Sequence, residues 1–263
     1  MPEPTLRLGD DQIQFYRDNG FLAVTQPLTT PDEIARLAAI YDDLFRRRVG
    51  RETGDQFDLA GTDEEGKEEA LPQILGPSRY APELVQGLLF ANAQALAKQL
   101  LGEEAAFGGD HAIFKPAGTG APTPWHQDEA YWDESLKYNS LSIWIPLQEA
   151  TVENGCMQFI PGSHKWEVQT HHSIGNDPRV HGLEIEMEVD ESKAVPCPLP
   201  AAGATFHDSR TLHYTGANQT QTPRRAYILG FGTAAVKIDQ PRDFYWNKLK
   251  QTARQARAES SKT

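Results

Sequence analysis

The sequence predicts a mainly β protein, an antiparallel sandwich or jelly roll with α-helices flanking it. Apolar residues recur at helical spacing only in the first part of the chain. From His111 onward they recur at every second position, as in half-buried strands. Turn residues divide this later part into short runs. Many short strands with helices kept upstream are typical of this architecture.

The chain has 263 residues, which is enough to bury a core of its own. One domain is expected, because all-β sandwiches and barrels often reach this size. We expect a helical part over about 9–102, a β core over about 107–235 and a polar C-terminal tail over about 240–263. The tail is expected to be a frayed helix or irregular.

The first helix is expected after Asp10, as its N-cap, and before Gly20, as its C-terminal stop. A third helix is expected over 82–102, where apolar residues again dominate. The segment 50–70, between the second and third helices, is polar and acidic. It is expected to form an exposed loop.

The second helix has the clearest signals. Thr30 would cap it, Pro31 takes the first helical position, and Glu33 would complete a capping box. Gly50 would end it. Its apolar face is formed by Ile34, Leu37, Ala38, Tyr41 and Phe45.

The clearest strand lies at 141–148, where apolar and other residues alternate. Asn154-Gly155, between two apolar runs, predicts a hairpin turn. Residues 203–216 and 224–235 predict two more strands. In the first strand Leu141, Ile143, Ile145 and Leu147 face one side, and Ser142 and Trp144 face the other.

Composition argues against two classes of partner. The formal net charge is −12, and a nucleic-acid-binding face usually carries a basic surplus, so no nucleic acid is expected. The N-terminus lacks the features of a signal peptide, and no apolar stretch approaches the roughly 18 residues of a membrane span, so no membrane is expected. Cys156 and Cys197 cannot form a disulfide framework, which favours a reducing, cytoplasmic compartment.

A candidate metal-binding pair lies in the stretch "APTPWHQDEAYW", where His126 and Asp128 stand one residue apart. On an extended segment their side chains point to the same face, with Cα atoms about 6.5–7 Å apart. That geometry lets an imidazole and a carboxylate converge on one ion. A polar loop could contain a histidine and an aspartate at the same spacing, so the pair alone does not establish a metal site.

A third ligand must come from the remaining histidines. His213 and His207 fall on one face of the strand expected at 203–216. His213 is preferred, because Thr215 shares its face and an arginine pair follows at 224–225. Two imidazoles and one carboxylate leave about half of an octahedral shell open, which suits Fe(II) oxygen chemistry better than a closed zinc site.

The other histidines are assigned structural positions. The adjacent His171 and His172 would face opposite ways on a strand. His181 lies in a polar loop, His164 at a turn where it would bond local backbone, and His111 at the start of a strand.

Three motifs in order carry a resemblance to a known family: "FKPAGTGAPTPWHQD", "SIWIPLQEATVENGCMQFIPGSHK" and "LHYTGANQTQTPRRAY". Together they resemble the phytanoyl-CoA dioxygenase family of Fe(II)- and 2-oxoglutarate-dependent oxygenases. The resemblance covers about residues 9–235. It implies a cupin-like, double-stranded β-helix core.

The resemblance also implies site residues. His126, Asp128 and His213 match the iron triad. Arg224, eleven positions after His213, matches the arginine that binds the distal carboxylate of 2-oxoglutarate. A guanidinium suits this role because it offers a charged, two-pronged donor to a carboxylate. Thr215 matches a hydroxyl that helps to hold the same carboxylate.

Three further residues fall in motifs of the same family. Trp144 resembles a position that lines the cosubstrate pocket, with a core aromatic as the alternative. Lys115 and Gln127 are also assigned to the site, with an exposed lysine and a turn glutamine as alternatives. Arg225 should face away from the pocket and act as a surface or salt-bridging arginine.

The reaction implied by the family consumes 2-oxoglutarate and O2 and releases succinate and CO2. Hydroxylation of a small molecule is the default outcome, by a monomer or small homo-oligomer. Asp128 argues against halogenation, because halogenating relatives have a small residue there. No cluster of Lys and Arg near the motifs suggests the 3′-phosphate site of a CoA ester. The alternatives are a silent jelly-roll binding protein and a cupin-type oxygenase without cosubstrate.

Overall fold

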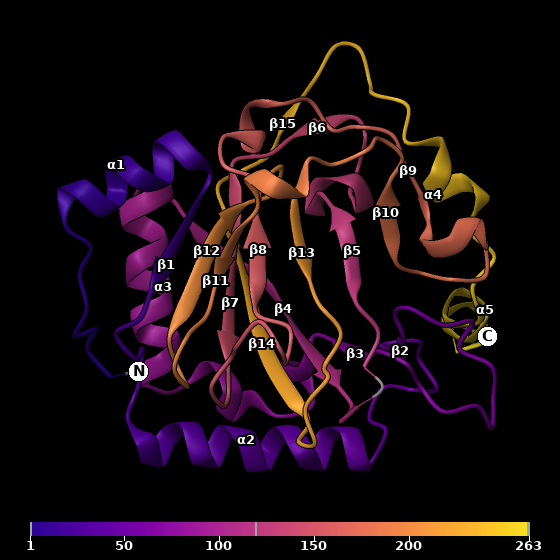
Figure 1. The fold of residues 1–263 in the computed structure, drawn as a ribbon, viewed down its shortest axis with the longest axis horizontal. Helices are drawn as coiled ribbons and strands as arrows, with labels where there is room; N and C mark the ends of the chain where they lie inside the picture. The colour runs from indigo at the N-terminus through magenta and orange to yellow at the C-terminus, as the bar shows by residue number, and fades with distance from the viewer. Residues whose placement is uncertain (1, 119, 262–263) are drawn as a thin grey trace.

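Two antiparallel sheets face each other in the computed structural model, which describes residues 2–118 and 120–261 (Figure 1). The larger sheet has the order β1-β12-β7-β14-β4-β3-β2 and the smaller one β11-β8-β13-β5. Along the chain β4, β7, β12 and β14 enter the larger sheet, whereas β5, β8, β11 and β13 enter the smaller one. Strands interleaved in this way between two sheets form a jelly roll, so the expected double-stranded β-helix is confirmed.

The bounds of the strands follow. The larger sheet contains β1 (Phe21–Val24), β12 (Ala204–Asp208), β7 (Ser140–Pro146), β14 (Arg224–Gly232), β4 (Ala106–Lys115), β3 (Pro72–Leu75) and β2 (Gln56–Asp58). The smaller sheet contains β11 (Val195–Cys197), β8 (Met157–Phe159), β13 (His213–Thr215) and β5 (Thr123–His126). Two short pairs complete the set: β9 (His171–Ser173) with β10 (Leu183–Ile185), and β6 (Leu136–Lys137) with β15 (Val236–Lys237).

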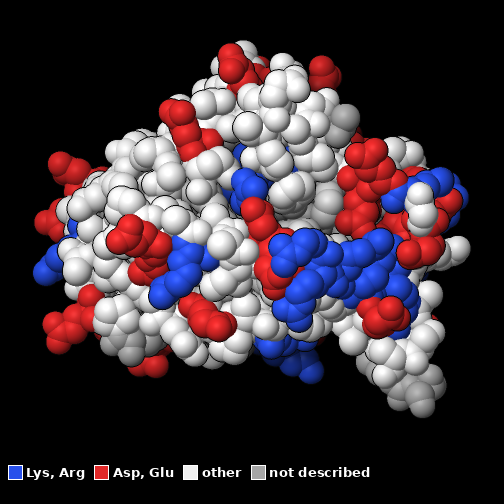
Figure 2. Space-filling view, turned by 90° about the horizontal axis from the view of Figure 1, so that it is seen from below, with Lys and Arg blue, Asp and Glu red and all other residues white. Residues whose placement is uncertain are grey.

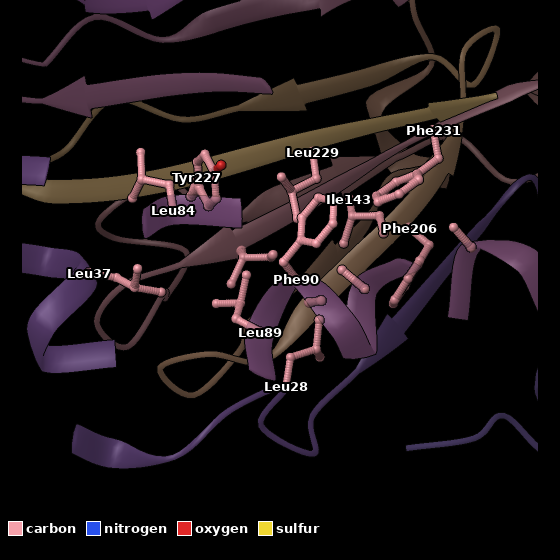
Figure 3. Packing of buried hydrophobic residues seen from close by; sticks show 14 of the residues in the cluster. Leu28, Leu37, Leu84, Leu89, Phe90, Ile143, Phe206, Tyr227, Leu229 and Phe231 are labelled. Carbon is pink, nitrogen blue, oxygen red and sulfur yellow. The ribbon is translucent and has the colours of Figure 1, made fainter. Parts of the chain in front are cut away.

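Helices cover the outer face of the larger sheet. They are α1 (Asp10–Asn19), α2 (Pro31–Arg46) and α3 (Leu88–Leu101). The helices α4 (Tyr245–Leu249) and α5 (Ala253–Ser260) lie elsewhere, and α4 contacts β9. Figure 3 shows Phe90 of α3 beside Ile143 and Leu229 of the sheet. Leu37 of α2 belongs to the same core cluster and lies at another part of it, away from these three residues. The alternation expected in β7 is confirmed, because Ile143 joins this outer core while Trp144 joins the inner one. No helix in the described part is both long and apolar enough to cross a bilayer.

Some expected helix boundaries were wrong. The N-cap of α1 is Gly9 rather than Asp10, whereas the stop at Gly20 is confirmed by its left-handed conformation. α2 ends at Arg46, four residues before Gly50. The third helix begins only at Leu88, because a 3-10 turn at Pro82–Val85 precedes it.

Glu33 caps a different helix from the one expected. The side chain of Thr30 accepts a hydrogen bond from the Glu33 backbone N–H at 3.3 Å, so the expected cap of α2 is confirmed. The Glu33 carboxylate, however, accepts hydrogen bonds from the backbone N–H groups of Leu88 and Leu89, at 3.0 and 3.2 Å. The N-cap of α3 is Gly87, which has no side chain that could accept a hydrogen bond. The distant Glu33 therefore accepts the hydrogen bonds of backbone N–H groups in the first turn of α3.

The segments 154–155 and 203–216 also differ from expectation. Gly155 does lie in a turn with positive φ, but the next strand, β8, pairs with β11 and β13 and not with β7, so there is no hairpin. Residues 203–216 form two strands, β12 and β13, in facing sheets. The Asp208 carboxylate accepts the Arg210 backbone N–H at 2.9 Å and so stabilises the intervening turn.

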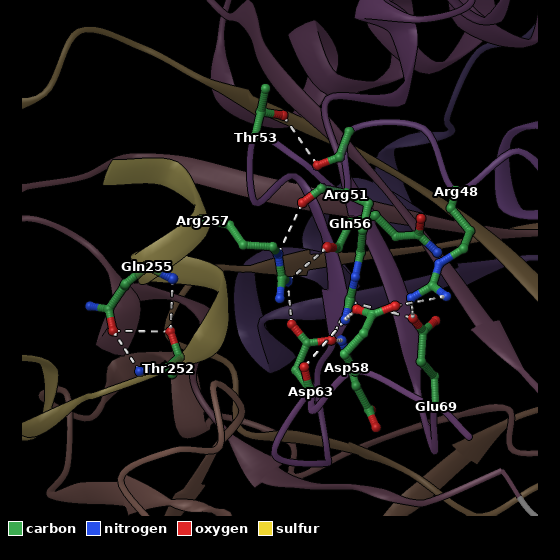
Figure 4. Close-up of polar contacts among 12 residues, drawn as sticks. Arg48, Arg51, Thr53, Gln56, Asp58, Asp63, Glu69, Thr252, Gln255 and Arg257 are labelled. Carbon is green, nitrogen blue, oxygen red and sulfur yellow. Dashed lines mark hydrogen bonds and ion pairs between the residues drawn. The ribbon is translucent and has the colours of Figure 1, made fainter. Parts of the chain in front are cut away.

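The expected exposed loop at 50–70 contains a buried ionic cluster (Figure 4). β2 is fully buried there, and the side chains of Arg51 and Asp63 are 9% and 3% exposed. Asp63 pairs with Arg51 and also with Arg257 of α5. The Arg257 Nε group donates to the Arg51 carbonyl oxygen at 2.9 Å. The C-terminal tail is therefore docked, contrary to expectation, because a contact far along the chain fixes it.

Asp63→Asn should lower the free energy of unfolding by about 3 kcal/mol, because it removes the carboxylate that two largely buried guanidinium groups share. Within the described part of the chain, Arg257 then has no carboxylate partner, and Arg51 keeps only the longer pairs with Glu69 and Glu65, at 3.4 and 3.5 Å. Asn keeps the size of the side chain and tolerates the left-handed backbone of this residue, whose φ is 59°. Asp43→Asn is the matched control. Its partners Arg46 and Arg47 are 72% and 62% exposed, so the loss should stay below about 1 kcal/mol. Urea unfolding measures both, and equal losses would contradict the buried cluster.

The lower face of the molecule carries a group of Lys and Arg side chains with acidic side chains around it (Figure 2). Two arginines that follow α2, Arg47 and Arg48, each lie 3.0 Å from a carboxylate, that of Asp43 and that of Glu69. A hollow of about 470 Å³ lies beside Arg48, lined in part by Phe45 and Phe114. It contains none of the residues expected in the functional site.

Candidate metal centre and cosubstrate pocket

The structure brings His126, Asp128 and His213 together. β5 ends at His126, and Asp128 opens the 3-10 turn η3 (Asp128–Tyr131) after one extended residue. β13 begins at His213, directly opposite His126 in the antiparallel register. One ligand atom from each of the three lies within 4.8 Å of the others. The His-x-Asp spacing therefore does direct the side chains of His126 and Asp128 toward one space of the size of a metal ion.

The two oxygens of the Asp128 carboxylate have different neighbours. The Nε2 atoms of His126 and His213 lie 3.7 and 3.5 Å from Oδ1. Oδ2 accepts a hydrogen bond from the Ser142 hydroxyl at 2.7 Å and lies 3.3 Å from Nε2 of His207. Oδ1 therefore faces the space shared with two imidazoles, while Oδ2 is held by the surrounding protein.

Backbone carbonyls fix the rings of two histidines. The Nδ1 atom of His126 lies 2.8 Å from the Pro124 carbonyl oxygen, and that of His213 lies 2.8 Å from the Thr211 carbonyl oxygen. A proton on Nδ1 leaves Nε2 as the lone-pair donor, which is the usual arrangement of a metal-ligating histidine. The buried Nδ1 of His207 has no such partner. The contact of Nδ1 with a backbone carbonyl therefore favours His213 over His207 as the third ligand more directly than their positions in the sequence do.

The electrostatics of the cluster suit a cation. Burial alone would raise the pKa of the Asp128 carboxyl, but His213, His126 and His207 hold it well below its usual range. Burial and, as the next cause, the neighbouring His126 hold the pKa of His213 well below its usual range. A carboxylate and a neutral imidazole are the protonation states that ligate a metal. Two histidines and one carboxylate with open positions are the donor set of non-haem iron oxygenases, so these residues fit iron.

Arg224 is a buried cation with unsatisfied donors. Its side chain is 1% exposed, and its Nε and Nη1 atoms have no hydrogen-bond partner. Burial lowers the pKa of the guanidinium to about 10, so it remains charged at neutral pH. No carboxylate in the described ranges lies within ion-pair distance of it. A buried unpaired charge is costly, so this guanidinium fits an anionic ligand such as the distal carboxylate of 2-oxoglutarate.

Two other predicted residues lie on the inner side of the barrel. The Trp144 ring is buried in the inner core, with the Arg224 guanidinium 5.3 Å from its centroid. The Thr215 hydroxyl is buried and donates to the Thr123 hydroxyl at 3.0 Å. The adjacent Arg225 points the other way and pairs with Asp42 of α2, as expected.

Lys115 and Gln127 have different partners from those expected. The Lys115 ammonium is fully buried and donates to the carbonyl oxygens of Ala121 and Gly216, at 2.5 and 2.8 Å. The Gln127 amide donates to the Arg210 carbonyl oxygen at 2.8 Å and accepts from the Gln169 backbone N–H at 2.8 Å. Lys115 also donates to the Thr215 carbonyl oxygen at 3.4 Å, and the second N–H of Gln127 faces the Glu167 carbonyl oxygen at 3.5 Å. The N–H donors of both side chains are therefore directed at backbone carbonyls of the loops around the site.

Some positions close to the site were missed or misplaced by sequence reasoning. Ser142 and His207 contact Asp128, and the alternation of β7 could have revealed Ser142 as an inward residue. His111 lies in the middle of β4, with an exposed side chain on the inner face. His181 packs against aromatic rings, and His164 contacts the distant Arg17 carbonyl oxygen rather than local backbone.

The jelly roll and its two-histidine, one-carboxylate cluster define an iron- and 2-oxoglutarate-dependent oxygenase. The family model described as Phytanoyl-CoA dioxygenase (PhyH) matches residues 16–226. The chain belongs to this family.

Individual relatives agree with this placement. The chain is 31% identical over 227 residues to a probable alpha-ketoglutarate-dependent hypophosphite dioxygenase of Stutzerimonas stutzeri, across 85% of this chain and 78% of that one. It is 42% identical to EvdO2 of Micromonospora carbonacea var. aurantiaca, with a TM-score of 0.80 across 93% of this chain and 99% of that one. EvdO2 has also been solved in complex with 2-oxoglutarate. The carbocyclase SnoK is 22% identical over 90% of this chain and 89% of that one, with a TM-score of 0.70, which shows the fold alone.

Proposed function

We propose that the protein uses Fe(II), 2-oxoglutarate and O2 to hydroxylate a small molecule, with release of succinate and CO2. The observation that carries the proposal is a cluster of two fixed imidazoles and a carboxylate on the same inner surface as a buried, unpaired guanidinium. The first part can hold a metal with open positions, and the second can hold a dicarboxylate cosubstrate.

Each residue has a physical task in this proposal. His126, Asp128 and His213 hold the iron, which supplies the oxidising power when it is bound together with its cosubstrate and O2. Arg224 neutralises and orients the distal carboxylate of 2-oxoglutarate, and Thr215 and Trp144 line the same pocket. Ser142 and His207 orient the Asp128 carboxylate through its second oxygen.

An anaerobic titration with Fe(II) and 2-oxoglutarate tests the first half of the proposal. We expect a weak charge-transfer band in visible light, and succinate after O2 is admitted. A cupin-type oxygenase without cosubstrate would give no 2-oxoglutarate-dependent band, and a silent binding protein would give no succinate. Either result would contradict the proposal.

Isotope labelling tests hydroxylation as the outcome. Under ¹⁸O₂ a hydroxylase places one labelled atom in succinate and the other in its product. An epimerisation, ring closure or desaturation would leave the organic product unlabelled. The substrate itself does not follow from likeness, because relatives are named for compounds as different as hypophosphite and ectoine. The Asp128 carboxylate supports hydroxylation over halogenation, because it takes the position where a halide would bind iron.

A further inference from the structure

The C-terminal segment 245–260 is attached directly to the loop that carries Asp128. The Trp246 indole N–H and the Asn247 amide both donate to the Ala130 carbonyl oxygen, at 2.9 and 2.8 Å. Ala130 belongs to η3, the same turn that begins at Asp128. At the other end of the segment, Arg257 pairs with the buried Asp63 (Figure 4). Figure 1 shows α4 and α5, in yellow, beside β9, β10 and β2. The segment is therefore fixed at both ends, and its first end lies beside the candidate metal centre.

Two cations lie between these anchors. The Lys250 ammonium lies 4.6 Å from the centroid of the Tyr131 ring, and that ring lies 6.2 Å from the His126 ring. A single aromatic ring therefore separates Lys250 from a candidate metal ligand. The Arg254 guanidinium lies 4.9 Å from the centroid of Phe57.

Neither cation has an anionic partner among residues 2–118 and 120–261. The Nε atom of Arg254 is buried without a hydrogen-bond partner. Asp55, which does act on Arg254, is itself held by Arg79 at 2.9 Å and by the Tyr80 hydroxyl at 2.6 Å. Burial and, as the smaller cause, the neighbouring Arg254 lower the pKa of Lys250 to about 7. Cations in such surroundings are stabilised when an anion binds.

Two histidines complete the cluster and connect it to the metal centre. The His181 ring stacks on Tyr131, with centroids 5.8 Å apart, and its buried Nδ1 has no partner. His111 lies on the inner face of β4, in register with Ile228, and its exposed side chain shows that this part of the interior is open. The surrounding protein lowers the pKa of His111, the Asp128 and Asp110 carboxylates oppose that shift, and Arg254 adds to it. His111 thus lies within the fields of both the metal-site carboxylate and the C-terminal cation.

We propose that the C-terminal segment forms one wall of the substrate site, and that Lys250 and Arg254 there bind an anionic group of the substrate, a carboxylate or a phosphorus oxyanion. This inference rests on the proposed function, since it assigns the substrate class of the same centre. His111 and His181 supply further donors toward the anion. The anionic group would be held beside Tyr131, so that the rest of a small molecule extends toward His126.

Calorimetry on protein loaded with Fe(II) and saturating 2-oxoglutarate, without oxygen, tests this inference. The probes are acetate and methylphosphonate, and the neutral controls are methyl acetate and dimethyl methylphosphonate. We expect at least one anion to bind the wild type while both esters fail to bind. Lys250→Met and Arg254→Met should each weaken that binding by about 10- to 100-fold. Lys250→Arg keeps the charge and should restore binding, so a folding defect in the Met variant would be recognised.

Lys248→Met is the matched control. Lys248 lies two residues before Lys250 on the same segment, but it is 62% exposed and pairs with Glu134 at 3.0 Å. Anion binding should be unchanged in this variant. Absence of anion binding, equal binding of the esters, or unchanged binding in both Lys250→Met and Arg254→Met would overturn the inference. The charge-transfer band of the wild type tests the proposed function separately, because that band depends on iron and 2-oxoglutarate.

Discussion

His213→Ala should abolish iron-dependent succinate formation, whereas His207→Ala should retain it at saturating iron. Both rings are buried beside Asp128, with their centroids 4.5 Å apart, so proximity alone does not distinguish them. The two oxygens of the Asp128 carboxylate distinguish the two histidines. His213 lies beside Oδ1 together with His126, whereas His207 lies beside Oδ2. Removing His213 takes away one of the three proposed ligands. In the same proposal, removing His207 takes away a contact that only orients the Asp128 carboxylate.

The expected cost of His207→Ala is about 10- to 100-fold in iron affinity, as is typical of residues that support a metal ligand. Succinate release should therefore be measured across a series of Fe(II) concentrations. His126→Ala is the positive control and should behave like His213→Ala. Loss of turnover in His207→Ala at every iron concentration, with activity retained in His213→Ala, would exchange the roles of the two histidines.

The sequence was most informative where a signal is local. The alternation in β7 correctly placed Trp144 on the inner face, because period two depends only on neighbouring residues. The same counting across 203–216 treated two strands as one, since no glycine or proline marks the turn at 209–212. His207 and His213 still face the same interior, but from opposite sheets. They therefore do not share a face of one strand, although the period of two predicted this.

Contacts between distant segments could not be predicted from sequence. Lys115 and Gln127 lie in the right motifs, yet backbone carbonyls of other loops use their donors. The composition of the C-terminal segment predicts a polar tail. The structure shows that Arg257 of this segment pairs with Asp63, 194 positions away in the chain. Neighbouring residues contain no information about such partners. The resemblance supplied Arg224 as a cosubstrate residue, and the structure adds the unpaired, buried state of its guanidinium.

Arg224→Ala should weaken 2-oxoglutarate binding by roughly 30- to 4,000-fold, which corresponds to about 2–5 kcal/mol for a carboxylate left unpaired in a closed pocket. Arg225→Ala should weaken it by roughly five-fold or less, because that side chain is 23% exposed and pairs with Asp42 on the outer face. The apparent Michaelis constant for 2-oxoglutarate, measured as succinate release at saturating iron, compares the two. A larger increase in Arg225→Ala would move the cosubstrate site to the other face of β14.

The two variants should also differ in stability without cosubstrate. Arg224→Ala removes a buried charge that has no partner, so the melting temperature of the cosubstrate-free protein should stay the same or rise. Arg225→Ala removes the ion pair with Asp42 and should lower the melting temperature slightly. At about 100 times its dissociation constant, 2-oxoglutarate should stabilise the wild type by about 2.7 kcal/mol, or on the order of 5–10 °C. Arg225→Ala should keep this shift and Arg224→Ala should lose it. An equal shift in both variants would mean that the unpaired guanidinium of Arg224 is not where the cosubstrate carboxylate binds.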